Sequence, residues 1–226
     1  MERRLNILTR MLAGGMRRFS PAGLWRRFRV TQTEHTDKVF WADKRNYRDA
    51  WSERARLALS LCVGEDLWLC DLGCGQQQLR PLLPAGYRYL PMDLVAWTAD
   101  TLVCDINAGF LPTAYLDACD VCLLLGVIEY VHDPAQLFRR LGETVPALVF
   151  SCHMPSIQIS GSAMSQRRHV NIRSQAEAHA LARDAGFFVA QTIAWKPDHI
   201  VVKAINTRPP TADRRTARAA IGPDHG

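Results

Sequence analysis

The chain is poor in the residues that mark several classes of protein. Aromatic residues make up 8% of its 226 residues, and 14 glycines and 12 prolines are too few for a collagen-like or low-complexity chain. No apolar run approaches the ~18–20 residues that span a membrane, and the basic start lacks the apolar stretch of a signal peptide. A hydrophobic content of 48% is enough for one buried core. We therefore expect a soluble, cytoplasmic protein with one globular domain.

Cysteine is present, but not in a disulfide or metal-binding pattern. The seven cysteines are an odd number and lie in apolar segments, which favours reduced, buried thiols. Cys119 and Cys122 have the spacing of half a zinc site, yet no second pair follows. In a strand, their side chains would also face opposite sides of the sheet. The sequence therefore predicts structural thiols and no metal site.

The net charge of +6 comes from the two ends of the chain. Residues 1–30 contain eight arginines and one acidic residue, whereas residues 31–203 have a net charge of −3. A nucleic-acid groove built into the fold would place the basic excess in the middle of the chain. The charge distribution therefore argues against a nucleic-acid partner.

Three segments differ in their residue patterns. We expect residues 1–44 to form a basic N-terminal arm, residues 45–205 a folded domain, and residues 206–226 a disordered tail, because the tail has no periodicity. Residues 1–19 place apolar side chains on one helical stripe and arginines on the other side. Such a helix can lie at the periphery of an anionic membrane or bind a partner protein. The alternative is an arm that folds against its own domain or frays.

From residue 67 onward, short apolar strands alternate with helices, which indicates a doubly wound α/β sheet. Near-continuous apolar strands such as Val121–Leu125 are typical of a sheet covered on both faces. The expected strands are Leu67–Leu72, Tyr87–Met92, Leu102–Cys104, Val121–Leu125, Ala147–Cys152, Phe188–Thr192 and Ile200–Lys203. The expected helices are residues 46–61, Gln77–Leu83, Pro134–Leu141 (with Asp133 as its N-cap) and Ser174–Ala185.

The sharpest motif is a glycine turn at the end of the first strand, Asp71-Leu72-Gly73-Cys74-Gly75. Without a Cβ, Gly73 and Gly75 let the backbone approach a ligand at the carboxyl end of the strand. A dinucleotide is disfavoured, because Gln78 replaces the third glycine of G-x-G-x-x-G and because Asp71 would lie beside the pyrophosphate. A carboxylate in this position suits a ligand with a cationic end.

Aspartates follow three successive strands. Asp93 lies 22 residues after Asp71, a spacing at which an acid can accept hydrogen bonds from both hydroxyls of a ribose. Asp105 ends the third strand and could accept the amino group of an adenine. A single strand-end aspartate is more often a solvated residue or a helix cap. Three of them in register at successive strand ends predict a shared binding site.

Together these motifs resemble those of the class I S-adenosylmethionine-dependent methyltransferases, over roughly residues 45–204. The runs Asp105–Pro112 and Glu129–Pro134 are most similar to a compact group that includes methyltransferase-like proteins of methionine biosynthesis and of bacterial polysaccharide clusters. The resemblance implies S-adenosylmethionine as the cofactor and a mostly parallel, seven-stranded sheet that ends in an antiparallel hairpin. The cofactor-binding residues that it implies are Asp71, Gly73, Cys74, Gly75, Asp93, Asp105, Ile106 and Gly126.

The sequence departs from the pattern of this family in three places. The family usually has a third glycine where Gln77 stands, and the larger side chain would narrow the space under the methionine end of the cofactor. Pro81 and Pro84 shorten the helix after the turn. Only eleven residues separate Asp93 from Asp105, so we expect the second crossover helix to be minimal or absent.

The resemblance predicts methyl transfer to a small-molecule or glycan acceptor, at oxygen. His132 and His153 both follow strand ends, and an imidazole with a pKa of ~6.5 suits a base that removes the proton of the acceptor. The alternative for each is a loop histidine bonded to backbone. Glu129 and Tyr130 could shape the acceptor site, although Tyr130 could equally be a core residue. The predicted hairpin turn at 196–198 could overhang the site.

A second hypothesis is a catalytically inactive S-adenosylmethionine-binding protein that regulates or scaffolds another protein through its N-terminal arm. Gln77, the shortened helix and the lack of an unambiguous base favour it. Methylation of nucleic acid ranks last, because Leu125-Gly126-Val127-Ile128 stands where such enzymes have Asn/Asp-Pro-Pro-aromatic. Turnover separates the first two hypotheses.

Overall fold

The computed structural model of the chain describes residues 38–47, 51–154, 169–171, 173–208 and 213–222. The described residues all belong to one compact unit of the chain. The helix expected over residues 1–19, with its membrane or partner contact, lies outside the described residues. Within the described part, no helix is long and apolar enough to cross a bilayer.

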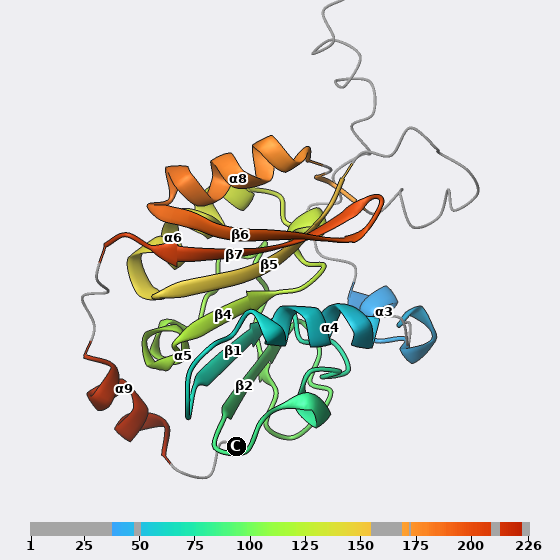
Figure 1. Cartoon of the computed structure of the whole chain (residues 1–226). Coiled ribbons are helices and arrows are strands. Elements are labelled where there is room, and N and C mark those ends of the chain that lie inside the picture. Colours follow the sequence, from blue (N-terminus) through green and yellow to red (C-terminus); the bar gives the residue numbers. More distant parts are fainter. Residues whose placement is uncertain (1–37, 48–50, 155–168, 172, 209–212, 223–226) are drawn as a thin grey trace, which may run out of the picture. The chain divides into compact units, whose positions relative to one another are not determined.

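Seven strands form one sheet in the order β3-β2-β1-β4-β5-β7-β6 (Figure 1). Neighbouring strands from β3 to β5 are parallel, and β7 is antiparallel to both β5 and β6. This architecture confirms the predicted doubly wound sheet with a terminal hairpin. Sheets of this kind bind ligands where the strand order reverses, here between β1 and β4. The strands are β1 (Trp68–Leu72), β2 (Arg88–Asp93), β3 (Leu102–Val103), β4 (Val121–Leu124), β5 (Ala147–His153), β6 (Phe187–Lys196) and β7 (His199–Asn206).

Helices cover both faces of the sheet, as the apolar strands require. Ala58 of α4 packs with Leu69 on one face. Helices α5, α6 and α8 share a core with the other face, where the rings of Phe138 and Phe150 meet edge to face at 5.2 Å. The described helices are α3 (Lys38–Trp41), α4 (Trp51–Ser60), α5 (Thr113–Ala118), α6 (Pro134–Thr144), α8 (Gln175–Asp184) and α9 (Arg214–Ile221), with 3-10 turns η2 (Lys44–Asn46), η3 (Arg80–Leu82) and η4 (Ile128–Tyr130).

Local signals in the sequence set where two of these helices begin. The Asp133 carboxylate accepts a hydrogen bond of 2.9 Å from the Gln136 N–H, and Pro134 occupies the first turn of α6, as predicted. Helix α8 begins with a reciprocal pair of hydrogen bonds between Ser174 and Glu177. At the start of both helices, a side chain therefore accepts a hydrogen bond from a backbone N–H that has no partner within the helix.

The helix expected at Gln77–Leu83 does not form, and that prediction is wrong. Turns fill residues 73–79, followed by the three-residue η3. Pro81 has no N–H to donate, and Pro84 ends the segment, so a regular helix cannot continue. The second crossover, between β2 and β3, consists of bends and turns, which agrees with the short spacing of Asp93 and Asp105.

The C-terminal segment is also not the featureless tail that the sequence predicted. Strand β7 extends to Asn206, and helix α9 lies beside α5 (Figure 1). Arg218 donates to the Asp120 carboxylate at 2.6 Å and to the Ala118 carbonyl at 2.9 Å, and its guanidinium lies over Trp68 at 5.2 Å. Because α9 buries no side chain fully, apolar periodicity could not reveal it; charged contacts hold it in place.

These contacts predict that Arg218→Ala lowers the free energy of unfolding by about 1 kcal/mol, since the ion pair with Asp120 is partly exposed to solvent. Arg215→Ala, at an exposed position of the same helix, controls for helix propensity and should change stability by less than about 0.5 kcal/mol. Urea denaturation of both variants measures the difference. Equal effects would mean that Arg218 does not anchor α9.

Candidate functional site

A cavity of about 460 Å³ opens at the carboxyl ends of the parallel strands. The structure brings every predicted cofactor-binding residue to its wall, from the ends of four strands that are far apart in the sequence. Glu129, Tyr130 and His153 line the same cavity. The residues that the sequence analysis predicted to bind a cofactor, and that line this wall, are Asp71, Gly73, Cys74, Gly75, Asp93, Asp105, Ile106 and Gly126.

Hydrogen bonds from backbone N–H groups of the glycine turn hold it against the neighbouring strand β2. The N–H groups of Gly73 and Cys74 donate to the Met92 carbonyl at 2.7 and 3.0 Å, and the Gly75 N–H donates to Asp93 at 2.8 Å. Gly73 and Gly75 have φ values of +84° and +50°, in the left-handed region that favours glycine. A Cβ on Gly75 would overlap the ring of Tyr47. The turn therefore needs glycine for its conformation and for the space around it.

Gln77 does not narrow the cavity, contrary to the expectation from the sequence. It is buried with a φ of +55°, a left-handed conformation that is uncommon for a residue with a side chain. Its amide nitrogen donates to the hydroxyls of Thr98 at 2.6 Å and Thr101 at 2.9 Å, while its carbonyl accepts from Arg80 at 2.7 Å. These hydrogen bonds hold the side chain away from the cavity wall.

Asp71 and Asp93 are buried carboxyls with different partners. Burial raises the pKa of Asp71 to about 6, partly opposed by a hydrogen bond of 2.5 Å from the Tyr89 hydroxyl. Burial also raises the pKa of Asp93, whose two oxygens accept the N–H groups of Gly75 and, at 3.1 Å, Val95. Both side chains lie on the cavity wall, so a bound cation or hydroxyl would stabilise their charged forms.

Arg54 is a cation on the cavity wall that the sequence analysis did not identify. It is only 8% exposed, and its guanidinium lies over the rings of Trp51 and Trp195 at 5.4 and 5.6 Å. Its Nε is buried and has no hydrogen-bond partner among the described residues. Burial lowers its pKa, opposed chiefly by the charge of Glu129. An arginine on the apolar stripe of the helix expected at 46–61 was the signal that could have found it.

Aromatic rings also line the cavity, and besides the predicted Tyr130 they include Trp41, Tyr47 and Trp51, which the sequence analysis did not place there. The ring of Trp41 meets Tyr130 at 4.8 Å, and Tyr47 meets Trp51 at 5.5 Å and Trp97 at 5.0 Å, all edge to face. Trp41 belongs to α3, in the segment that the sequence analysis assigned to the arm, so the folded unit begins before residue 45. The concentration of aromatic residues between 40 and 51, in a chain with few of them, was the available signal.

Glu129 positions the end of β5. One carboxylate oxygen accepts the backbone N–H of His153 at 2.7 Å, and the other is buried with no hydrogen-bond partner among the described residues. Burial raises the pKa of Glu129. The neighbouring Tyr130 lies on the cavity wall, where its hydroxyl is 3.2 Å from Nε2 of His169. Tyr130 is therefore a cavity residue as well as a packing residue.

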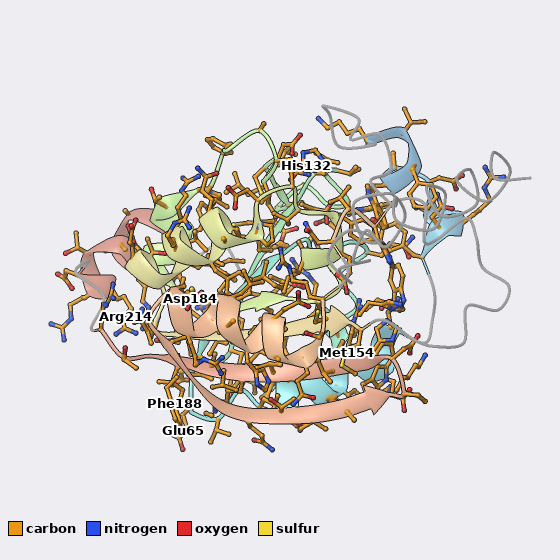
Figure 2. All side chains as sticks on the ribbon, turned by 90° about the horizontal axis from the view of Figure 1, so that it is seen from above. Glu65, His132, Met154, Asp184, Phe188 and Arg214 are labelled. Atoms are coloured by element: carbon orange, nitrogen blue, oxygen red, sulfur yellow. The ribbon has the colours of Figure 1, made fainter. Side chains whose placement is uncertain are left out.

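The two histidines proposed as bases are placed differently. His153 lines the cavity, together with His169, Asp198 and His199. His132 does not: it borders a smaller hollow of about 70 Å³, and its backbone N–H donates to the Asn107 side chain at 2.9 Å. In Figure 2, His132 lies well apart from Met154, the residue that follows His153. The structure therefore brings only His153 to the site.

No protein-family model matches the chain, and no curated protein matches it. Solved structures share its fold. In a complex between the Haloferax volcanii Trm112 methyltransferase activator and a putative methyltransferase, the TM-score is 0.61 at 18% identity, over 76% of this chain and 97% of that one. A SAM-dependent methyltransferase from Aquifex aeolicus gives 0.58 at 14% identity, over 76% and 99%. Human N-acetylserotonin methyltransferase with SAM gives 0.56 at 20% identity; the similarity covers 73% of this chain but only 55% of the human chain.

These similarities define the fold as that of the class I methyltransferases. At such low identities they do not by themselves carry an activity to this chain.

The raised pKa of Asp71 predicts a pH-dependent cost in stability. The native state holds this proton up to about pH 6, whereas the unfolded state loses it near the ordinary value of 3.8. Relative to Asp71→Asn, wild type should therefore lose about 2–3 kcal/mol of unfolding free energy as the pH rises from 4 to 7. Urea denaturation at both pH values measures this. The exposed Glu65→Gln is the carboxyl-to-amide control, and a difference for Asp71→Asn that does not change with pH would contradict the assignment.

Proposed function

We propose that the chain is an S-adenosylmethionine-dependent methyltransferase that acts on a small-molecule or glycan acceptor, at oxygen. The observation that carries the proposal is the arrangement of charge in one cavity. Asp93 and Asp105 lie at and just after the ends of β2 and β3, and Asp71 and Arg54, whose Nε has no hydrogen-bond partner among the described residues, line the same cavity. Two carboxylates that can accept hydrogen bonds from an adenosine, with a carboxylate and a guanidinium for the two charged groups of an amino acid, are a set of side chains that suits this cofactor.

Each part of the cofactor has residues that suit it. Asp93 would accept hydrogen bonds from the ribose hydroxyls, and Asp105 would accept the adenine amino group, with Ile106 beside the ring. The Asp71 carboxylate would bind the ammonium of the methionine part, and Arg54 its carboxylate. When bound, the group supplies a methyl carbon activated by a sulfonium.

The residues of the acceptor end favour a small ring or a sugar. Trp41, Tyr130 and Trp195 present aromatic surfaces, and His153 and His169 present imidazoles to the same cavity. Aromatic faces bind flat or apolar faces of a ligand, while a neighbouring base can take a proton. Holding the acceptor in a reactive orientation can lower the barrier by ~7–11 kcal/mol. The human structure of similar fold is named for a small acceptor, N-acetylserotonin.

The inactive cofactor-binding partner remains the second hypothesis, but one of its supports is lost. Gln77 is held by Thr98 and Thr101 and leaves the cavity open. Incubation with methyl-labelled S-adenosylmethionine and cell extract separates the two hypotheses. Release of S-adenosylhomocysteine with label in a small product supports the enzyme, and binding without release supports the partner.

Isothermal titration with S-adenosylhomocysteine tests the cofactor site. We expect wild type to bind and Asp93→Ala to bind at least 10-fold more weakly, because hydrogen bonds to a charged group are each worth about 1.5–3 kcal/mol. Asp117→Ala, on α5 and outside the cavity wall, should bind like wild type. A wild-type chain that does not bind would overturn the proposed function; unchanged affinity of Asp93→Ala would show that the ribose site is misassigned.

The role of Arg54 has its own test. S-adenosyl-3-thiopropylamine is S-adenosylhomocysteine without the carboxylate, and we expect wild type to bind it at least 10-fold more weakly. In Arg54→Met, the ratio of the affinities for S-adenosylhomocysteine and for this analogue should fall toward one, because the partner of the carboxylate is gone. Arg56→Met, on the exposed side of the same helix, should keep the full preference. An unchanged preference in Arg54→Met would place the carboxylate elsewhere.

A further inference from the structure

The last residue pair of β5 and β7 places two imidazoles side by side on the cavity wall. His153 and His199 are opposite each other in the antiparallel register, and their ring centroids are 4.5 Å apart. Next to this pair, the Met154 N–H donates to the Asp198 carbonyl at 2.7 Å. This hydrogen bond joins the end of β5 to the turn between β6 and β7. Asp198 lines the same cavity. Rigid strand ends and a tight turn therefore fix the three side chains relative to one another.

Close contacts link these three side chains, and they determine which ring nitrogens of the two histidines carry a proton. Nδ1 of His199 lies 2.7 Å from a carboxylate oxygen of Asp198. A carboxylate only accepts, so the proton of a neutral His199 is on Nδ1 and its Nε2 carries a lone pair. That Nε2 lies 3.4 Å from Nδ1 of His153. His153 must then hold its proton on Nδ1, which leaves its own Nε2 as the unprotonated nitrogen.

We propose that Asp198 and His199 are positioning residues that hold His153 as the general base for a hydroxyl acceptor. This proposal rests on the proposed function and specifies how its acceptor loses a proton. As the acceptor oxygen bonds to the methyl carbon, its proton passes to Nε2 of His153, and the electron pair of the broken carbon–sulfur bond stays on sulfur. The Asp198 carboxylate stabilises the imidazolium that forms on His153, through His199 and through its second oxygen, which lies 3.9 Å from Nδ1 of His153.

The surroundings of His153 suit this task. Burial, with the neighbouring His199, lowers its pKa, so the ring is neutral near pH 7 and able to accept a proton. Glu129 fixes its backbone N–H from η4. His169, whose ring lies 5.3 Å from His153, has a pKa lowered to about 4 and adds no positive charge. The base is thus held by neighbours that do not compete for the incoming proton.

The same three residues could instead hold a metal ion, since one ligand atom from each lies within 4.8 Å of the others. The hydrogen bond between Asp198 and Nδ1 of His199 favours the proton chain, because that carboxylate oxygen already has a partner. A divalent ion would bind the nitrogens that face each other and displace the proton between them. The two arrangements therefore predict different protonation of His153.

Long-range proton–nitrogen NMR spectra of the full chain, labelled with ¹⁵N-histidine and free of metal and cofactor, distinguish them. We expect both His153 and His199 in the Nδ1–H form at pH 8. In His199→Phe, His153 should return to the Nε2–H form that a free neutral imidazole favours, and Asp198→Ala should shift the His199 signals. His179→Asn, a histidine on α8 outside the cavity wall, is the matched control and should leave His153 unchanged.

Three results would overturn the proposal. An Nε2–H form of His153 in wild type would show that Asp198 and His199 do not set the tautomer of His153. A His153 signal that His199→Phe does not alter would show the same. Stoichiometric shifts of both rings at micromolar Zn²⁺ would identify a metal site. S-adenosylhomocysteine affinity should be unchanged in His199→Phe, so a failed tautomer test is distinct from a failed cofactor site. With an identified acceptor, His199→Phe should lower kcat about 10- to 100-fold at unchanged KM for the cofactor.

Discussion

The parallel register of three strands is the constraint on which the site depends. Asp71 pairs with Pro91 and Leu72 with Met92, while Asp93 pairs with Val103, so the carboxyl ends of β1, β2 and β3 meet at one edge. Backbone hydrogen bonds from the glycine turn to Met92 and Asp93 then lock the turn onto β2. A slip of one residue in any of these pairs would turn an acid to the opposite face of the sheet. Strand register therefore fixes where the strand-end acids meet, and the turns that follow the strands complete the wall of the cavity.

This edge concentrates charge that the isolated fold does not fully neutralise. The raised pKa values of Asp71, Asp93 and Glu129 have burial as their main cause, and Arg54 has a buried nitrogen that meets no hydrogen-bond partner in the described part of the chain. Buried polar groups that lack partners cost about 1–3 kcal/mol each, so the fold carries this site at the expense of stability. A ligand with complementary charges would recover that free energy on binding. Preorganised groups of this kind also lose little entropy when the ligand arrives.

The sequence predicted the parts of the site that lie next to strong local signals. Strand-end acids beside a glycine turn, such as Asp71 and Asp93, can be read from pattern alone. It did not predict Trp41 or Arg54, because what brings them to the cavity is the packing of helices before the first strand. The two strand-end histidines had equal signals in the sequence, and only the fold shows that His132 borders a separate, smaller hollow. The proline-rich segment after Gly75 and the charged contacts of α9 show the same limit: apolar periodicity does not detect elements that are held by turns and ion pairs.

The contact between Gly126 and Arg54 ties two distant positions of the chain together. Gly126 has a φ of +72°, its N–H donates to the Ser151 hydroxyl at 2.8 Å, and a Cβ there would overlap the guanidinium of Arg54. A larger residue at 126 would thus have to displace a side chain that is wedged between Trp51 and Trp195. In divergent evolution, the loss of this glycine and the loss of this arginine should accompany each other. A chain that lost one of the two residues would no longer be constrained to keep the other.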